Sequence, residues 1–193
     1  MSEFFPKANI KHPQRGDLLI SEPFLADPNF ERTVVLLCEH SEEGSFGFVL
    51  NKPGLLKLGD VMDELDPFNA DLFIGGPVDH NTAHFLHRIP EILVGGQEVA
   101  PGVVWGGDFE QFSLMAQTGQ LHDHDFRFFI GYSGWGSGQL EGELEQNSWV
   151  VFRGVNQRHV FELAHDQLWR QVLEEMGGKY KMFANYPVDP RLN

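Results

Sequence analysis

The stretch GYSGWGSGQLE, Gly131–Glu141, decides how the second half of this chain folds. Its first two residues end the largely apolar run DFRFFIGY, Asp125–Tyr132, which predicts a buried strand. Four glycines lie within its first eight residues, and glycine permits positive φ angles and close backbone approach where a side chain would clash. Leu140 and Leu144 then stand four residues apart, the spacing of one helical face. The stretch therefore predicts a structural corner between a strand and a short helix.

Trp135 is expected to be buried in this corner, where it packs against the short helix. With Gly138 as the N-cap of that helix, Glu141 falls at its third position, near backbone amides that have no partner within the helix. The alternative places Trp135 at the surface beside Tyr132 and Gln139, as a platform for a ligand.

The glycine spacing does not match the phosphate-binding and nucleophile motifs that such a stretch can suggest. A nucleophile elbow, Gly-x-Ser-x-Gly, centred on Ser133 has Trp135 in place of its last glycine. A dinucleotide fingerprint that starts at Gly134 has Gln139 in place of its third glycine. Residues 131–151 contain several glutamates and no Lys or Arg, so a polyanion bound there would meet carboxylates.

Short apolar runs separated by turn signals predict an α+β fold with a mixed, largely antiparallel sheet. Thr33–Cys38, TVVLLC, is continuously apolar like a central strand, and the turn after it leads into Phe46–Asn51, so the two predict a hairpin. Two strand–helix–strand units in the second half predict some parallel pairing. The other expected strands are Asp17–Ser21, Asp71–Ile74, Thr82–His87, Val103–Trp105 and Trp149–Phe152, and the other expected helices are Leu58–Leu65, one from Asp108 to Gly119, and Ala164–Met176.

The chain has 193 residues and is expected to form a single domain, 1–193, with room for a small lobe around residues 53–100. A single cysteine excludes an internal disulfide and is typical of a reducing compartment. The apolar runs are far shorter than the ~20 residues of a membrane-spanning helix, and the first residues lack the apolar region of a signal peptide. The expected location is the cytoplasm.

The charge balance disfavours nucleic acid and anionic membranes as partners. Lys and Arg number 14 against 28 Asp and Glu, which gives a formal net charge of −14. A protein that grips duplex DNA neutralises several phosphates with clustered basic residues. Here the basic residues are dispersed, and Lys179 with Lys181 is the tightest pair.

Cys38-Glu39-His40 is the first candidate for chemistry. In an uninterrupted strand Cys38 and His40 point to one face, about 7 Å apart along the chain, and could form a thiolate–imidazole pair or half of a metal site. Cys38 closes a buried apolar run, however, where free cysteine acts as a small hydrophobic residue. We therefore expect a structural Cys38 and a surface His40.

The histidine clusters lack the spacing of a complete metal site. In His122-Asp123-His124-Asp125 the last aspartate comes too early for the metallohydrolase pattern, so this segment is expected to be a solvated loop. In the cluster of His80, His84 and His87, the last two would share a face only on a helix, whereas Thr82–His87 alternates like a strand. No metal and no other cofactor is expected.

Several segments together resemble one family along nearly the whole chain. They are LLISEPFLADPNFERTVVLLCEH, GFVLNKP, FIGGPV, GYSGWGSGQLEGELEQNSW and the tail YPVDPRLN. In this order they are similar to the YqgE/AlgH family of bacterial proteins, with Ser133 and Ser137 where that family usually has alanine and proline. The resemblance implies a mixed sheet curled towards a pseudo-barrel with flanking helices, in a cytosolic protein.

The resemblance leaves the activity open, because the family's biochemical activity is unassigned and one branch has been called a transcriptional regulator. The WGGDFE segment and the histidine-rich region 80–87 depart from the commonest family pattern, so no function is carried through them. The family segments are expected to line a polar groove for a protein or small-molecule partner. The residues expected on this surface are Glu22, Asp27, Arg32, His40, Asn51, Tyr132, Trp135 and Gln139.

Three functions are consistent with these features. The favoured one is a non-enzymatic binding or regulatory protein, because the sequence shows no complete set of nucleophile, base and orienting group. The first alternative is a hydrolase or thiol-dependent enzyme that uses Cys38 and His40. The second is a transcriptional regulator, which the dispersed basic residues disfavour.

We expect the purified protein to show no salt-dependent binding to duplex DNA, because its net charge of −14 repels phosphates. A mobility-shift assay at ~100 mM salt checks this. A shifted band that weakens steeply as the salt concentration rises would contradict it, since counterion release produces that dependence.

Overall fold

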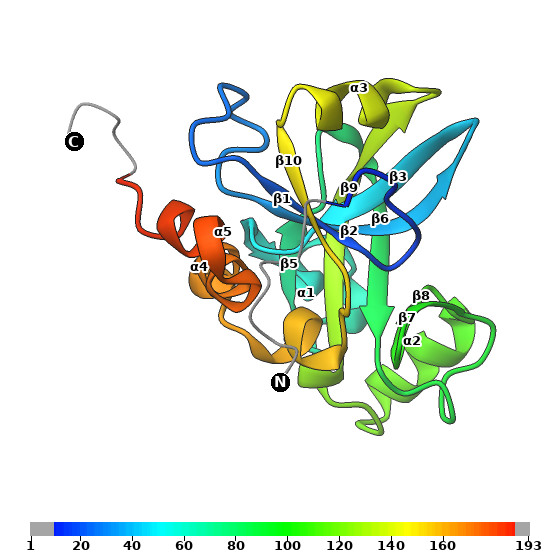
Figure 1. The fold of residues 1–193 in the computed structure, drawn as a ribbon. Coiled ribbons are helices and arrows are strands. Elements are labelled where there is room, and N and C mark those ends of the chain that lie inside the picture. Colours follow the sequence, from blue (N-terminus) through cyan, green and yellow to red (C-terminus); the bar gives the residue numbers. More distant parts are fainter. Residues whose placement is uncertain (1–9, 188–193) are drawn as a thin grey trace, which may run out of the picture.

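A computed structural model describes residues 10–187 and shows an α+β fold (Figure 1). Its strands are β1 Leu18–Ser21, β2 Val34–Ser41, β3 Gly44–Val49, β4 Pro53–Lys57, β5 Asp71–Ile74, β6 Val78–His87, β7 Gln97–Ala100, β8 Val103–Trp105, β9 Phe126–Gly136 and β10 Trp149–Phe152. Its α-helices are α1 Leu58–Val61, α2 Phe109–Gln117, α3 Gln139–Glu145, α4 His165–Met176 and α5 Gly178–Phe183. Shorter helical turns are η1 Asp63–Leu65, η2 Asp123–Asp125 and η3 Arg158–Glu162.

The long strand β9 connects two groups of strands into one curled, open sheet (Figure 1). Along one edge, its first part pairs in parallel with β5 and its last part pairs antiparallel with β3. β6 pairs antiparallel with β9 as well, and the path continues to β8 and β7. Beyond β3 the order is β2, β1 and β10, all antiparallel, which confirms the predicted hairpin and the largely antiparallel sheet.

The predicted strand–helix–strand units do not produce parallel neighbours. β8 and β9 run in the same direction, but β6 lies between them and pairs antiparallel with both. β9 and β10 are separated by β3, β2 and β1. The parallel pair that the described strands do contain is β5 with β9, whose connection passes through β6 to β8 and α2.

The predicted corner lies farther along the chain than expected. β9 continues through Gly131 to Gly136, so the first glycines of the stretch belong to the strand, and the turn falls just before α3. Gly138 is the N-cap of α3, as predicted, with φ 72°. Gly134 has no positive φ angle, and neither does Gly136, whereas Gly131 has φ 67°.

Gly131 stands where β9 changes its neighbour from β5 to β3. A Cβ atom at this position would lie 2.7 Å from the carbonyl oxygen of Val78, so only glycine fits without movement of the backbone. At the same junction Gly75 donates its amide to the carbonyl of Ile130, and the buried Ser133 hydroxyl donates to the carbonyl of Gly75 at 3.0 Å. The glycines therefore allow one strand to belong to both parts of the sheet.

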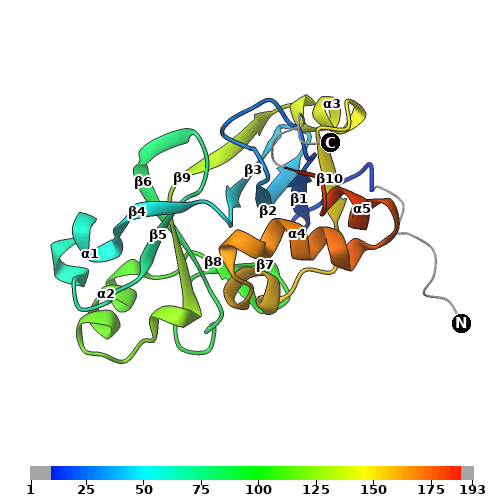
Figure 2. The ribbon, with the colours of Figure 1, turned by 90° about the vertical axis from the view of Figure 1, so that its left-hand side faces the viewer.

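Three groups of buried apolar side chains stabilise the two faces of this sheet. The largest lies between the sheet and α4, which contributes Leu168, Trp169 and Val172 to it. The second lies between β5, β6 and β9 on one side and α1 and α2 on the other, at the end of the molecule away from α5 in Figure 2. The third lies beneath α3.

The division into one domain with a small lobe around residues 53–100 stays a prediction.

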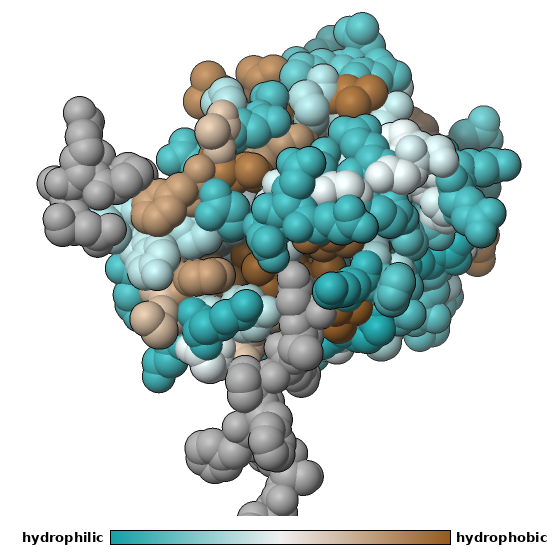
Figure 3. Space-filling model, turned by 45° about the horizontal axis from the view of Figure 1, so that its top comes forward, coloured by the Kyte–Doolittle hydropathy of each residue, from teal (hydrophilic) through white to brown (hydrophobic). Residues whose placement is uncertain are grey.

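Polar side chains cover most of the face shown in Figure 3, with apolar residues in scattered patches. None of the helices in residues 10–187 is long and apolar enough to cross a membrane.

Replacing Gly131 with alanine is expected to lower the free energy of unfolding by about 1–3 kcal/mol, because alanine is strained at φ 67° and meets the carbonyl of Val78. Gly136→Ala is the matched control, since the nearest atom to its Cβ is 4.0 Å away, and its effect should stay within about 0.5 kcal/mol. Urea denaturation of both variants measures the difference. Equal stabilities of the two variants would contradict the role of Gly131.

Candidate functional site

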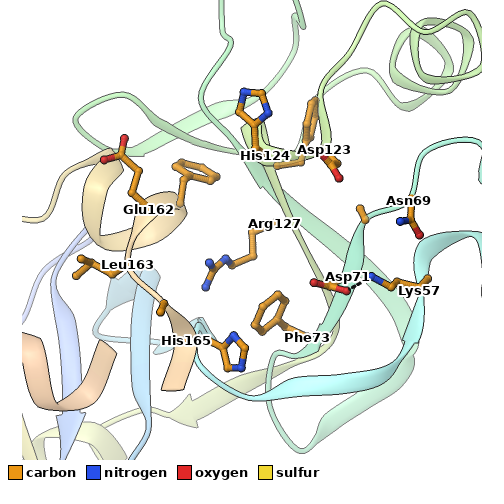
Figure 4. Close-up of a pocket in the computed structure, with 14 residues that line it drawn as sticks. Lys57, Asn69, Asp71, Phe73, Asp123, His124, Arg127, Glu162, Leu163 and His165 are labelled. Carbon is orange, nitrogen blue, oxygen red and sulfur yellow. Dashed lines mark hydrogen bonds and ion pairs between the residues drawn. The ribbon is translucent and has the colours of Figure 1, made fainter. Parts of the chain in front are cut away.

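Arg127 extends from β9 into a cavity on the face of the sheet opposite α2. Because side chains alternate along a strand, Phe126 and Phe128 point towards α2, and Arg127 points the other way together with Phe129. Figure 4 shows the arginine reaching towards Leu163 and His165, in the segment that leads into α4.

Arg127 is partly buried, and its guanidinium lines the cavity. Its Nη1 donates to the carbonyl of Leu50 at 2.7 Å, and its Cζ lies 4.6 Å from the ring centre of Phe73. Burial lowers the pKa of Arg127 to about 10, with Asp71 acting weakly in the opposite direction, so the group stays charged at neutral pH. Within residues 10–187, Nε and Nη2 have no hydrogen-bond partner and no carboxylate forms an ion pair with Arg127.

The cavity has a volume of about 440 Å³ and lies between β5, η2 and the start of α4 (Figure 4). Two of the carboxylates in the cavity wall already form ion pairs with basic side chains. Asp71 pairs with Lys57, while Glu162 accepts from Arg88 at 3.0 Å. Arg88 also binds Asp125 at 2.9 Å, which ties η2 to η3. Among the described residues, the wall therefore places no carboxylate within ion-pair distance of Arg127, and Asp71 acts on it only from farther away.

A second cavity, of about 570 Å³, lies on the other side of His165, which lines both. Two of the residues expected at a partner surface, Arg32 and Asn51, line this second cavity. Arg32 has φ 48°, donates to the carbonyl oxygens of Tyr186 and Pro187 at 2.8 and 2.6 Å, and has a buried Nε with no hydrogen-bond partner. Asn51 accepts from the amide of Val34 and donates to the carbonyl of Arg32.

Three further expected residues stand around α3 instead. Trp135 is 5% exposed, and its indole N–H donates to Glu143 at 3.0 Å. Gln139 accepts from the amide of Gly136 and donates to the same Glu143. His40 lies 3.6 Å from Glu141 of the helix. Trp135 is therefore buried as expected, and these side chains fasten α3 to the sheet.

The remaining three expected residues are separate from both groups. Asp27 accepts from the amide of Asn29 within its own turn, and the backbone amide of Glu22 donates to Ser148. Tyr132 packs against Phe46. The eight residues are thus distributed over several places, with Arg32 and Asn51 sharing a cavity, and a role for any of them in partner binding stays a prediction.

Cys38 is buried, as expected, and it does not form the pair with His40 that an uninterrupted strand would allow. A β-bulge between Leu37 and Glu39 shifts the register of β2, so the strand does not alternate regularly across it. Cys38 packs into the main core, whereas His40 stands by α3 on the other face, where its Nδ1 lies 2.7 Å from Ser45 Oγ. Burial raises the pKa of the Cys38 thiol well above its ordinary value.

Neither histidine cluster brings three potential metal ligands together within the described residues. His122 and His124 stack on each other at η2, and His87 is buried with its Nε2 3.0 Å from the carbonyl of Gly106. Burial lowers the pKa of both His84 and His87. In the part of the chain that the structure describes, no three His, Cys, Asp or Glu side chains could hold a metal ion. The expectation that the protein carries no metal stays a prediction.

Sequence reasoning missed Arg127, although the sequence contains a signal for it. Arg127 is the second residue of FRFFI, Phe126–Ile130, and the only charged one in this otherwise apolar run, where a charge is costly unless something compensates it. An isolated charge in an apolar strand can therefore indicate a functional position.

Comparisons with known proteins identify relatives along almost the whole chain. The family model described as AlgH-like (DUF179) matches residues 18–181. A UPF0301 protein of Cytophaga hutchinsonii is 47% identical over 180 residues, covering 93% of this chain and 98% of the relative. A UPF0301 protein of Chlorobaculum tepidum is 43% identical over 178 residues, covering 92% and 95%.

Two solved structures are similar in fold. A Corynebacterium diphtheriae protein gives a TM-score of 0.73 at 23% identity, covering 91% of this chain and 93% of its own. The solution structure of AlgH from Pseudomonas aeruginosa gives 0.68 at 27% identity, covering 97% and 98%.

Cys38 is expected to react with a thiol reagent about a thousandfold more slowly in the folded protein than in urea, because labelling requires an opening of the core that costs roughly 4 kcal/mol or more. Absorbance with a chromogenic disulfide measures both rates. Fast labelling of the native protein near neutral pH would show an exposed thiolate and revive a thiol-dependent activity.

Proposed function

This chain belongs to the AlgH-like family, and we propose that it acts as a non-enzymatic binding or regulatory protein for a small anionic ligand held by Arg127. We further propose that it works in the cytoplasm, where a single reduced cysteine is ordinary.

The observation that carries this proposal is the partly buried charge of Arg127, which has no carboxylate at ion-pair distance among the described residues. Removing a cation partly from water without an ion pair costs free energy, and part of this cost is recovered when an anion binds beside it. The free Nε–Nη2 edge offers two parallel donors, the arrangement that arginine uses for carboxylate and phosphate oxygens. The partial burial of Arg127 strengthens this attraction, because the protein around it replaces part of its water shell.

The groups on the cavity wall support binding rather than covalent catalysis. The described lining residues include no Ser, Thr or Cys, the usual covalent nucleophiles, and two of the carboxylates are held in ion pairs with Lys57 and Arg88. A ligand that contacts both β9 and the start of α4 would stabilise the folded packing of these two elements by mass action. Ligand binding could regulate the protein through this change in stability.

To test this, small carboxylates and phosphate monoesters are titrated into the protein and its melting temperature is followed. A true ligand at a free concentration of about 100 times its Kd should raise the melting temperature by about 5–10 °C, the shift expected for a chain of this size. Arg127→Gln should abolish the rise. The bound compound should be recovered unchanged, as judged by NMR after prolonged incubation.

Arg158→Gln is the matched control, because it removes the same charge from an exposed arginine on η3 whose ion pair with Glu175 is 3.6 Å long. This variant should respond to ligand like the unmodified protein. The proposal fails if Arg127→Gln keeps the full response or if the compound is converted to product.

A further inference from the structure

We infer that the anionic group is a phosphoryl group, a phosphate monoester dianion, held jointly by Arg127 and the uncapped N-terminus of α4. The inference rests on the proposed binding function and names the chemistry of its ligand. Two separate features of the cavity lead to it.

The first feature is the start of α4. The N-cap residue is Ala164, which has an N-cap backbone conformation, φ −61° and ψ 132°, but a methyl side chain that cannot accept a hydrogen bond. The amide of Gln167 bonds to the carbonyl of Ala164, whereas the amides of His165 and Asp166 have no acceptor among the described residues. A twelve-residue helix thus begins with free donors and the positive end of its dipole.

The second feature is that Arg127 extends towards this helix start. Leu163, Ala164 and His165 form one wall of the cavity, and Figure 4 shows Arg127 reaching from β9 towards this wall. The cavity is therefore flanked by a guanidinium with a free edge and by a helix N-terminus, two elements that are far apart in the sequence and that both attract anions.

The geometry of these donors favours phosphate over carboxylate. A carboxylate has two oxygens in one plane, which the free edge of Arg127 alone can satisfy. A phosphoryl group has three terminal oxygens that point in different directions, so it can accept from the arginine and from the helix amides at once. A phosphoryl group also carries two negative charges, so it is attracted more strongly than a carboxylate by the guanidinium of Arg127 and the positive end of the α4 dipole together.

The nearby carboxylates do not occupy the position proposed for the phosphoryl group. Asp71 is paired with Lys57 and Glu162 with Arg88, while Asp123 and Asp166 are exposed to solvent, which screens them. The imidazoles of His124 and His165 also line the cavity and can add donors. A volume of about 440 Å³ leaves space beyond the phosphate for a small organic group.

The test is an NMR titration of the full chain, labelled with ¹⁵N, with inorganic phosphate and with acetate at constant ionic strength. Phosphate should shift the amide signals of His165 and Asp166 and the Nε signal of Arg127 in a saturable way. Ala164→Asp supplies a carboxylate cap that occupies the amides, so it should lower the phosphate affinity at least tenfold while it raises the stability of the helix. Arg127→Gln should lower the affinity by a similar factor, and Arg158→Gln should leave it unchanged.

The outcomes separate this inference from the proposed function. If acetate binds in an Arg127-dependent manner while phosphate leaves the α4 amides unshifted, the ligand is a carboxylate and the phosphoryl inference is wrong. If phosphate binds to Ala164→Asp as tightly as to the unmodified protein, the helix N-terminus takes no part and the inference is also wrong. If neither anion shifts the Nε signal of Arg127, the proposed function fails as well.

Discussion

Strand β9 is hydrogen-bonded to both groups of strands, and the positions of both the core and the cavity depend on this double membership. A strand that changes its neighbour partway along must bend, and side chains at the bend would collide with the adjoining backbone. Gly131 and Gly75 remove these collisions, since a Cβ on either would lie within 2.7 Å of a carbonyl oxygen. The curl of the sheet, which the family resemblance implied, follows from this bend without closure into a barrel.

The same strand places a cation where a typical core residue would lie. Phe126 and Phe128 fill the apolar cluster under α2, and the alternation of the strand then forces Arg127 towards the start of α4. A hydrophobic side chain of similar volume would remove the cost of burying an unpaired charge. Arg127 is held in place by its hydrogen bond to the carbonyl of Leu50 and by its contact with the ring of Phe73, and the proposed ligand would add the counter-charge that these two contacts do not supply.

The polar residues of the glycine stretch and its surroundings have a different role. Glu143 accepts from the indole N–H groups of both Trp135 and Trp149, at 3.0 and 2.7 Å, and from Gln139. These bonds hold a short helix that contains a glycine and has no side-chain N-cap. A motif that is easily recognised in the sequence thus stabilises the fold, and the cavity lies elsewhere.

Local patterns in the sequence determined most of the strands, the hairpin, the cap residues Asp108 and Gly138, and the burial of Trp135 and Cys38, because these depend on periodicity and on neighbours along the chain. The edge strand β4 exposes Leu55 and Leu56 and shows no alternation of apolar and polar residues, so the sequence did not predict it. The bulge that separates Cys38 from His40 and the single parallel pair within the described sheet depend on contacts across strands. The cavity depends on the tertiary structure for the same reason: Arg127 and the start of α4 are separated in the chain, and only the packing of α4 against the sheet brings them to one site.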